Sequence, residues 1–250
     1  MIQALPSAFL GAPIAHRALH DVTAGRPENS RAAVQAAIDA GYGIEIDLQL
    51  SADGVAIVFH DDDLDRLTEA VGPVRARTAE ALAQIPLRHG HEGLPSFAEI
   101  LAQVAGQVPL LVELKDQTPD DGALEVAAAR DLVGYAGPVA VMSFNPRMVG
   151  HMADLAPDVP RGLTTCAFDP DEFPVPEAVG AHLRDIADFD AVGACFISHH
   201  AIDLDRPRVQ ALRAAGVPVL CWTIRSAQAE ATARKRADNV TFEGYSAALA

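Results

Sequence analysis

The stretch GIEIDLQLSADGVAIVFH, residues 43–60, decides the fold because it holds two apolar strand-like runs joined by a turn. Asp53-Gly54 between alternating apolar residues is a strong signal for an antiparallel hairpin. We therefore expect residues 44–50 and 55–60 to pair across a two-residue loop. The second arm of this hairpin then stands outside any parallel sheet that the rest of the chain forms.

Eight strand-like runs remain, and helical segments separate them. This alternation predicts a parallel (β/α)8 barrel, or TIM barrel, with the hairpin inserted after its second strand and with functional residues at the carboxyl ends of the strands. An open doubly wound sheet is the structural alternative. The runs are Pro13–His16, Ile44–Leu50, Leu110–Leu114, Val139–Phe144, Arg161–Thr165, Ala194–His199, Val217–Ile224 and Asn239–Phe242.

Two helices carry clear end signals. Ser30 precedes an apolar stripe that stops at Gly41, and Ser96 with Glu99 forms a capping box for the helix that ends near residue 106. The stretch 61–95 departs most from the alternation. We expect it to contain one short helical piece and to cap the barrel mouth.

Composition narrows the function. The chain has 250 residues, half of them apolar and 21% charged, and we expect a single domain over 1–250. A net charge of -15 argues against nucleic acid and anionic membranes as partners. No run approaches the roughly 20 apolar residues of a membrane span, so we expect a cytoplasmic protein with a small-molecule ligand. The sequence leaves the oligomeric state open.

The three cysteines lie in separate apolar stretches without a CxxC pair. This favours reduced core thiols over disulfides or a zinc site. They are Cys166, Cys195 and Cys221.

Ionisable residues gather at the ends of the first strands, where burial of unpaired charge is costly unless the groups bind a metal or do chemistry. Glu45 and Asp47 are two apart on a strand, so both point to one face. In a two-residue hairpin His60 lies directly opposite Asp47, with Cβ atoms about 4.5–5.5 Å apart. Glu113 ends the next barrel strand and adds a third carboxylate.

Carboxylates without a cysteine favour a hard divalent cation, Mg²⁺, Ca²⁺ or Mn²⁺, over zinc. With Arg17 and Lys115 such a cation makes a positive pocket that suits a phosphate-bearing ligand. Trp222, the sole tryptophan, ends the seventh barrel strand. It could pack on the substrate or belong to the core. His199 and His200 could line the mouth or serve a structural role.

Several motifs follow one another along the chain: Ala15-His16-Arg17, Pro27-Glu28-Asn29-Ser30, Gly43-Ile44-Glu45-Ile46-Asp47, Asp53-Gly54-Val55, Phe59-His60-Asp61, Leu64-Asp65-Arg66-Leu67-Thr68, Glu113-Leu114-Lys115, Ser143-Phe144 and Trp222-Thr223. In this order they closely resemble the glycerophosphodiester phosphodiesterase family. The resemblance spans almost the whole chain and is densest over the first 115 residues.

The resemblance implies a TIM barrel that hydrolyses glycerophosphodiesters to sn-glycerol 3-phosphate and an alcohol with the help of one divalent cation, usually Mg²⁺ or Ca²⁺. It also implies roles for individual residues, as general acid and base, metal ligands, phosphate contacts and bracing residues. Which histidine is the acid stays open, as does a cyclic phosphate intermediate. The general acid and base would be His16 and His60, and the metal ligands Glu45, Asp47 and Glu113. The phosphate contacts would be Arg17 and Lys115, and the bracing residues Glu28 and Asn29.

Two positions depart from the family pattern. Ala18 stands where the family has glycine, which matters if that position requires a positive φ. The last strand ends in Phe242-Glu243-Gly244 instead of Thr-Asp. Cleavage of a lysophospholipid or another phosphodiester, with a cyclic phosphate as product, is a second interpretation. A barrel that binds phosphodiesters without turnover is a third.

Overall fold

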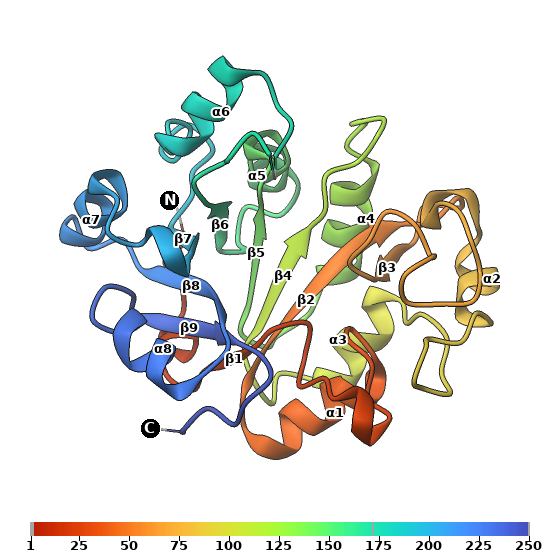
Figure 1. Ribbon diagram of the computed structural model, residues 1–250. Coiled ribbons are helices and arrows are strands. Elements are labelled where there is room, and N and C mark those ends of the chain that lie inside the picture. Colours follow the sequence, from red (N-terminus) through yellow and green to blue (C-terminus); the bar gives the residue numbers. More distant parts are fainter. Residues whose placement is uncertain (1–2, 172, 250) are drawn as a thin grey trace.

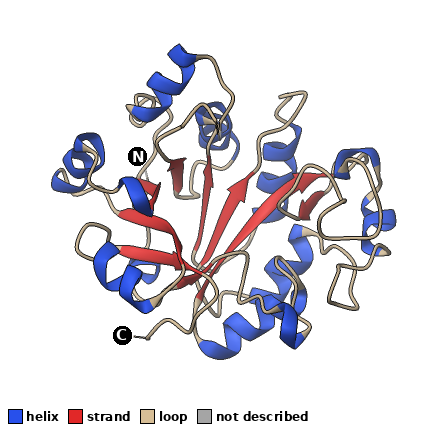
Figure 2. Cartoon of the chain, in the orientation of Figure 1, coloured by secondary structure: helices blue, strands red, loops and turns tan. Residues whose placement is uncertain are grey.

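A closed barrel of parallel strands forms the centre of the molecule in a computed structural model that describes residues 3–171 and 173–249. The strand order is β1-β9-β8-β7-β6-β5-β4-β2, and pairing of β1 with β2 closes the sheet. Helices surround the strands (Figures 1 and 2). The predicted TIM barrel is confirmed, and the doubly wound alternative is wrong because an open sheet would leave β1 and β2 unpaired.

The observed strands lie within two residues of the expected bounds. They are β1 (Ile14–Ala15), β2 (Gly43–Leu50), β3 (Ala56–Val58), β4 (Leu110–Leu114), β5 (Val139–Ser143), β6 (Arg161–Thr165), β7 (Phe196–His200), β8 (Val219–Ile224) and β9 (Asn239–Phe242). The α-helices are α1 (Arg31–Ala40), α2 (Ala79–Ala83), α3 (Phe97–Val104), α4 (Ala123–Leu132), α5 (Pro146–Leu155), α6 (Glu177–Arg184), α7 (Pro207–Ala214) and α8 (Ala227–Ala233). Short 3-10 helices are η1 (Ser7–Leu10), η2 (Val22–Ala24), η3 (Val74–Ala76) and η4 (Ala201–Asp203).

The hairpin of β2 and β3 is antiparallel as expected, but its register differs by one residue. Leu48 lies opposite Val58, and the next pair outward from the turn is Asp47 with Phe59, whose amide donates to the Asp47 carbonyl at 3.0 Å. The expectation that His60 lies directly opposite Asp47 is therefore wrong. His60 sits one residue further along.

The cause of this difference is the hairpin loop, which has three residues, 52–54, instead of two. Ser51 still pairs with Val55 through a backbone hydrogen bond of 3.0 Å. Gly54 then takes a left-handed φ of 76°. A type I turn followed by a left-handed glycine is the usual three-residue solution, so the same Asp-Gly pair serves a loop of different length.

The predicted helix signals are confirmed. The Ser30 hydroxyl accepts the Ala33 amide, and Gly41 ends α1 in the left-handed conformation. Ser96 and Glu99 make both hydrogen bonds of the capping box at the start of α3. None of the described helices is long and apolar enough to cross a bilayer.

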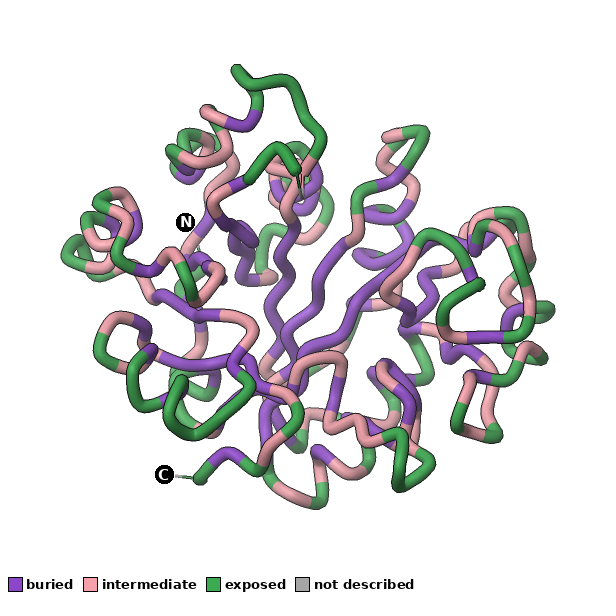
Figure 3. Tube along the Cα trace, viewed as in Figure 1, coloured by how far each residue is buried: buried purple, intermediate pink, exposed green. Residues whose placement is uncertain are grey.

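Two apolar layers hold the barrel together, and in Figure 3 the buried trace follows the strands. The larger core lies between the barrel and its helices, and a smaller one fills the barrel interior. Phe196 occupies so much of this interior that a Cβ at Gly162 would lie 2.5 Å from its ring. Any side chain at that position would push the Phe196 ring out of the packed interior. The smaller core is formed by Leu5, Phe9, Ile14, Leu111, Ala140, Met142, Phe196 and Leu220.

Two of the three thiols are fully buried, as expected for core cysteines. Cys166 and Cys221 lie in the interior, and Cys195 is half-buried. Burial raises the pKa of the Cys221 thiol to about 12. A thiol with such a pKa is protonated and inert at neutral pH.

The segment 61–95 does not cover the barrel mouth. It packs beside β3 around a small apolar core of its own, to the right in Figure 1. None of its residues lines the cavity at the carboxyl ends of the barrel strands, which is described below. The expectation of a cap is therefore wrong, because the apolar residues of the segment are used against β3. This core combines Ile57 and Phe59, in and directly after β3, with Leu64, Val74, Leu82, Leu87 and Leu94 of the segment.

Candidate active site

A cavity of about 160 Å³ opens at the carboxyl ends of the barrel strands. All residues that the sequence assigned to catalysis, metal binding or phosphate contact line it, although they come from segments far apart in the chain. Its lining is His16, Arg17, Glu45, Asp47, His60, Glu113, Lys115, Met142, Phe144, Ser198, Trp222, Thr223, Arg225 and Thr241.

Three buried carboxylates form the floor of this cavity. Glu45, Asp47 and Glu113 each present an oxygen within 4.8 Å of the others. The parallel register explains the meeting, since Asp47 of β2 lies beside Glu113 of β4. The Lys115 Nζ reaches in from the end of β4, 2.5 Å from Glu113 Oε1 and 2.9 Å from Asp47 Oδ1.

The charges of this cluster are not balanced by the protein alone. Burial, together with the charges of Asp47 and Glu113, raises the pKa of Glu45 well above its ordinary value. Burial alone would also raise the pKa of Asp47, but Lys115 and His60 outweigh it and lower that pKa. A divalent cation would stabilise the ionised form of all three acids, and an oxygen-only donor set fits Mg²⁺, Ca²⁺ or Mn²⁺.

His16 is held by a carboxylate that the sequence analysis did not assign to the site. Its Nδ1 lies 2.6 Å from Glu243 Oε2, so Nε2 is left for the cavity. Glu243 also accepts from Arg225 Nε at 2.7 Å. The hydrogen bond from His16, with the charge of Arg225 beside it, lowers the pKa of Glu243, whereas burial lowers the pKa of His16. At neutral pH the pair is therefore a carboxylate and a neutral imidazole.

Closure of the barrel creates this pair. β1 and β9 are neighbours, and the His16 amide donates to the Phe242 carbonyl at 2.9 Å. The residue after Phe242 therefore stands beside His16, although it is 227 positions away in the chain. The signal that could have found Glu243 was the predicted adjacency of the first and last barrel strands.

His60 is held in the same way by the residue that follows it. Its Nδ1 lies 2.7 Å from Asp61 Oδ1. Arg66 donates hydrogen bonds to both Asp61 oxygens and to both Glu28 oxygens, so the Asp61 carboxylate is itself held in place. Hydrogen bonds from His60 and Arg66 lower the pKa of Asp61 against the effect of burial. Each imidazole in the cavity thus has its Nδ1 engaged by an ionised acid.

The chain makes a tight left-handed bend directly after β1. Arg17 and Ala18 have φ of 52° and 64°. The bend turns the Arg17 amide onto Glu45 Oε2 at 2.8 Å, and the Ala18 amide onto the Glu45 carbonyl at 2.9 Å. Alanine thus adopts the positive φ that glycine takes more easily, at a cost of roughly 1–2 kcal/mol.

Glu28 and Asn29, the two predicted bracing residues, each bind a residue that lines the cavity. Glu28 Oε1 accepts from Arg17 Nη1 at 2.8 Å. Asn29 donates from Nδ2 to Asp47 Oδ2 at 2.8 Å. These contacts orient the Arg17 guanidinium and the Asp47 carboxylate.

The far wall combines an aromatic ring with two hydroxyls. Trp222 donates from its indole to the Ser198 carbonyl at 3.0 Å, and its ring lies 5.6 Å from that of Phe144. It lines the cavity instead of the core. The hydroxyls of Ser198 and Thr241 are buried and have no hydrogen-bond partner in the described part of the chain. They are available to a ligand that carries hydroxyl groups.

The adjacent histidines of β7 face different surroundings. His200 is half-buried and its ring lies 4.8 Å from that of Trp222. His199 is fully buried between the barrel and its helices, with Nδ1 2.8 Å from Thr165 Oγ1. Burial lowers the pKa of His199 to about 4. His199 is therefore a structural residue, and it is neutral near pH 7.

A pH-dependent stability follows from His199. Below pH 6.5 the unfolded chain binds a proton there that the folded chain refuses until about pH 4. As the pH falls through this range, we expect the free energy of unfolding to decrease by about 1.4 kcal/mol per pH unit for this one proton. Urea unfolding of His199→Gln at several pH values should show a free energy of unfolding that depends less on pH, by the equivalent of about one proton.

The matched control is His91→Gln, because His91 is exposed. It should keep the pH dependence of the original chain. Equal slopes for both variants and the original chain would contradict the buried, neutral state of His199.

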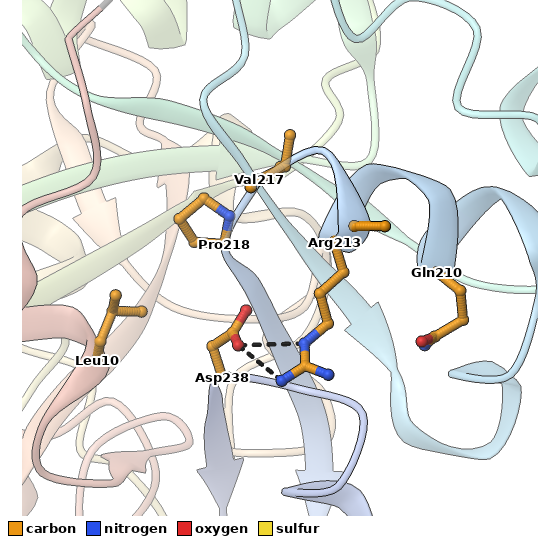
Figure 4. Close-up of a pocket in the computed structure, with 8 residues that line it drawn as sticks. Leu10, Gln210, Arg213, Val217, Pro218 and Asp238 are labelled. Atoms are coloured by element: carbon orange, nitrogen blue, oxygen red, sulfur yellow. Dashed lines mark hydrogen bonds and ion pairs between the residues drawn. The ribbon is translucent and has the colours of Figure 1, made fainter.

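A second cavity, of about 490 Å³, lies at the opposite end of the barrel (Figure 4). Arg213 points across it to Asp238 and donates from Nε and Nη2 at 3.1 and 3.0 Å. The other Asp238 oxygen accepts the Val219 amide at 2.9 Å. The charged groups shown are thus engaged with each other, and this amino-terminal face of a barrel usually serves stability.

The fold and the site define a TIM-barrel protein with a buried acid cluster between two carboxylate-held histidines. Residues 16–241 match the model of the Glycerophosphoryl diester phosphodiesterase family. The chain belongs to this family.

Two curated relatives each match more than half of the chain. The chain is 31% identical over 162 residues to a putative glycerophosphodiester phosphodiesterase, YhdW, of Bacillus subtilis, which covers 61% of the chain and 65% of that relative. It is 29% identical over 147 residues to an uncharacterized protein of Mycobacterium tuberculosis, covering 53% of the chain and 48% of the relative. The chain thus spans about half to two thirds of the length of these relatives.

Solved structures share the fold. A phosphodiesterase from Oleispira antarctica in complex with the product sn-glycerol-3-phosphate superposes with a TM-score of 0.79 at 24% identity, covering 94% of both chains. A putative glycerophosphoryl diester phosphodiesterase from Silicibacter pomeroyi gives 0.74 at 20% identity, covering 94% of this chain and 93% of its own. At such identities the likeness establishes the barrel architecture.

Proposed function

We propose that the chain hydrolyses glycerophosphodiesters to sn-glycerol 3-phosphate and an alcohol. The observation that carries this proposal is the pair of carboxylate-held imidazoles in one cavity above three buried acids. Arg17 and Lys115 add positive charge beside them, as an anionic diester requires. The unpartnered hydroxyls of Ser198 and Thr241 suit the hydroxyls of glycerol.

Glu45, Asp47 and Glu113 are the residues that would hold one divalent cation, Mg²⁺, Ca²⁺ or Mn²⁺. When bound, such an ion neutralises charge that develops on the phosphoryl oxygens. Arg17 shares that task, and Lys115 is a second phosphate contact once the acids are otherwise neutralised. Trp222 packs on the substrate from the opposite wall.

His16 and His60 divide the proton transfers. We assign the base to His16, because its lowered pKa keeps Nε2 free to accept a proton. His60 is then the acid that protonates the leaving alkoxide. The attacking oxygen forms a bond to phosphorus, the bond to the alcohol oxygen breaks, and each histidine moves one proton. Each transfer contributes roughly 10²–10⁴-fold.

Phosphorus NMR of the products tests this proposal. Purified protein with glycerophosphocholine and a divalent cation should give sn-glycerol 3-phosphate and choline. A persistent cyclic phosphate would favour the alternative in which the 2-hydroxyl attacks. Phosphocholine as product, or tight binding without any product, would overturn the proposal.

Glu243 provides a test of how His16 is positioned. We expect Glu243→Gln to lower kcat by roughly 10²-fold, because the imidazolium that forms during catalysis loses its charged partner. The carboxylate favours the protonated form of His16, so its removal should also move the acid limb of the pH profile to lower pH.

Asp205→Asn is the control, since it removes a carboxylate from an exposed ion pair with Arg236. It should leave kcat and the pH profile unchanged. An unchanged pH profile in Glu243→Gln would show that Glu243 does not act through His16.

A further inference from the structure

A larger space adjoins the candidate active site. It has a volume of about 840 Å³ and lies between the ends of β4, β5 and β8, the start of α5, and α6 with the loop before it. We call it the aromatic groove. Its apolar lining includes Phe144, Phe168, Phe173, Val175, Val179 and Trp222.

The walls of the aromatic groove are rings that pack against each other. The Phe144 ring lies 5.6 Å from Trp222, 5.4 Å from Phe173 and 6.1 Å from Phe168. On the outer side, Val175 and Val179 are 36% and 45% exposed. The groove therefore offers an apolar surface to an occupant, although the chain as a whole is strongly acidic.

The aromatic groove is continuous with the catalytic cavity. Five residues line both spaces: His60, Glu113, Lys115, Phe144 and Trp222. An occupant of the groove can thus be part of the same molecule as a diester in the cavity. A space of this size and polarity is typical of small-molecule sites.

We propose that the substrate is a lysophospholipid, whose glycerophosphodiester reacts in the cavity while its single acyl chain lies in the aromatic groove. This inference rests on the proposed function and adds the substrate class. The glycerol part binds at the acid cluster and the buried hydroxyls. The acyl chain attached to glycerol extends past Glu113 and Lys115, which line both spaces, into the aromatic groove. Hydrolysis of lysophosphatidylcholine by the same step gives lysophosphatidate and choline.

Choline release from glycerophosphocholine and from monomeric lysophosphatidylcholines of increasing chain length tests the proposal. We expect kcat/KM to rise roughly two- to fourfold per methylene until the groove is filled. Val179→Asp should abolish this rise but keep the rate on glycerophosphocholine. Val126→Asp is the control, because Val126 is similarly exposed on α4, outside the groove, and it should behave like the original chain.

Binding provides a readout that does not depend on turnover. Trp222 is the sole tryptophan, so its fluorescence reports directly on the groove. Dodecylphosphocholine below its micellar concentration should change the emission of the original chain and of Val126→Asp, and the Val179→Asp variant should respond only at higher concentration.

The outcomes separate the two proposals. Hydrolysis of glycerophosphocholine without any gain from the acyl chain overturns the lysophospholipid assignment and leaves the proposed function in place. The lysophospholipid assignment is also overturned if kcat/KM rises only when the alkyl chain is part of the alcohol that is released, and not when it is attached to glycerol. No choline from any substrate overturns the proposed function.

Discussion

Replacing His16 or His60 by alanine is expected to lower kcat/KM for glycerophosphocholine by roughly 10²–10⁴-fold each. Each imidazole lines the cavity with its Nδ1 bound to an ionised carboxylate, so in the proposed mechanism each substitution removes one proton transfer. Steady-state rates with saturating cation measure the effect, and circular dichroism confirms that the fold is intact.

The double variant sharpens this test. The effects of substituting residues that act as one unit are not additive. The loss of kcat/KM in the double variant should therefore be well below the product of the two single losses. His91→Ala, at an exposed position, is the control and should retain full activity. Full activity in both single variants would refute the two-histidine mechanism.

Glu45→Gln is expected to abolish cation-dependent stability and to lower turnover by about 10³-fold, on the scale of several kcal/mol that a metal contributes. Without a cation, the raised pKa of Glu45 means that its carboxyl already tends to hold a proton. Glutamine imitates that neutral form and can still accept the Arg17 amide. In EDTA the variant should therefore unfold with nearly the free energy of the original chain.

Thermal unfolding with and without Mg²⁺, Ca²⁺ or Mn²⁺ measures this difference. At 100 times its Kd, a cation stabilises the original chain by about 2.7 kcal/mol. Glu125→Gln is the control, because Glu125 is a buried carboxylate outside the site, paired with His151. Equal stabilisation of Glu45→Gln and the original chain would show that the acid cluster does not bind the ion.

Local signals in the sequence predicted most of the fold. Serine caps, a left-handed glycine and the alternation of apolar runs act over a few residues, so Ser30, Gly41 and Ser96 marked helix ends correctly. The hairpin register failed because Asp53-Gly54 fits two loop lengths, and hydrogen bonding between Ser51 and Val55 decides between them.

The candidate site was predicted where its members lie in one motif or on paired strands. Glu243 was missed because its contact with His16 depends on barrel closure and spans the whole chain. The aromatic groove was missed for a related reason. Phe168 and Phe173 lie in a loop without periodicity, and only the folded structure brings them beside Phe144.

We propose that the three buried acids and the two carboxylate-held histidines form a metal-dependent phosphodiesterase site. The most direct measurement is release of sn-glycerol 3-phosphate from glycerophosphocholine by protein stripped with EDTA, before and after addition of Mg²⁺, Ca²⁺ or Mn²⁺. We expect no release from the stripped protein and restored release with at least one ion. Undiminished release after stripping, or none with any ion, would contradict the account.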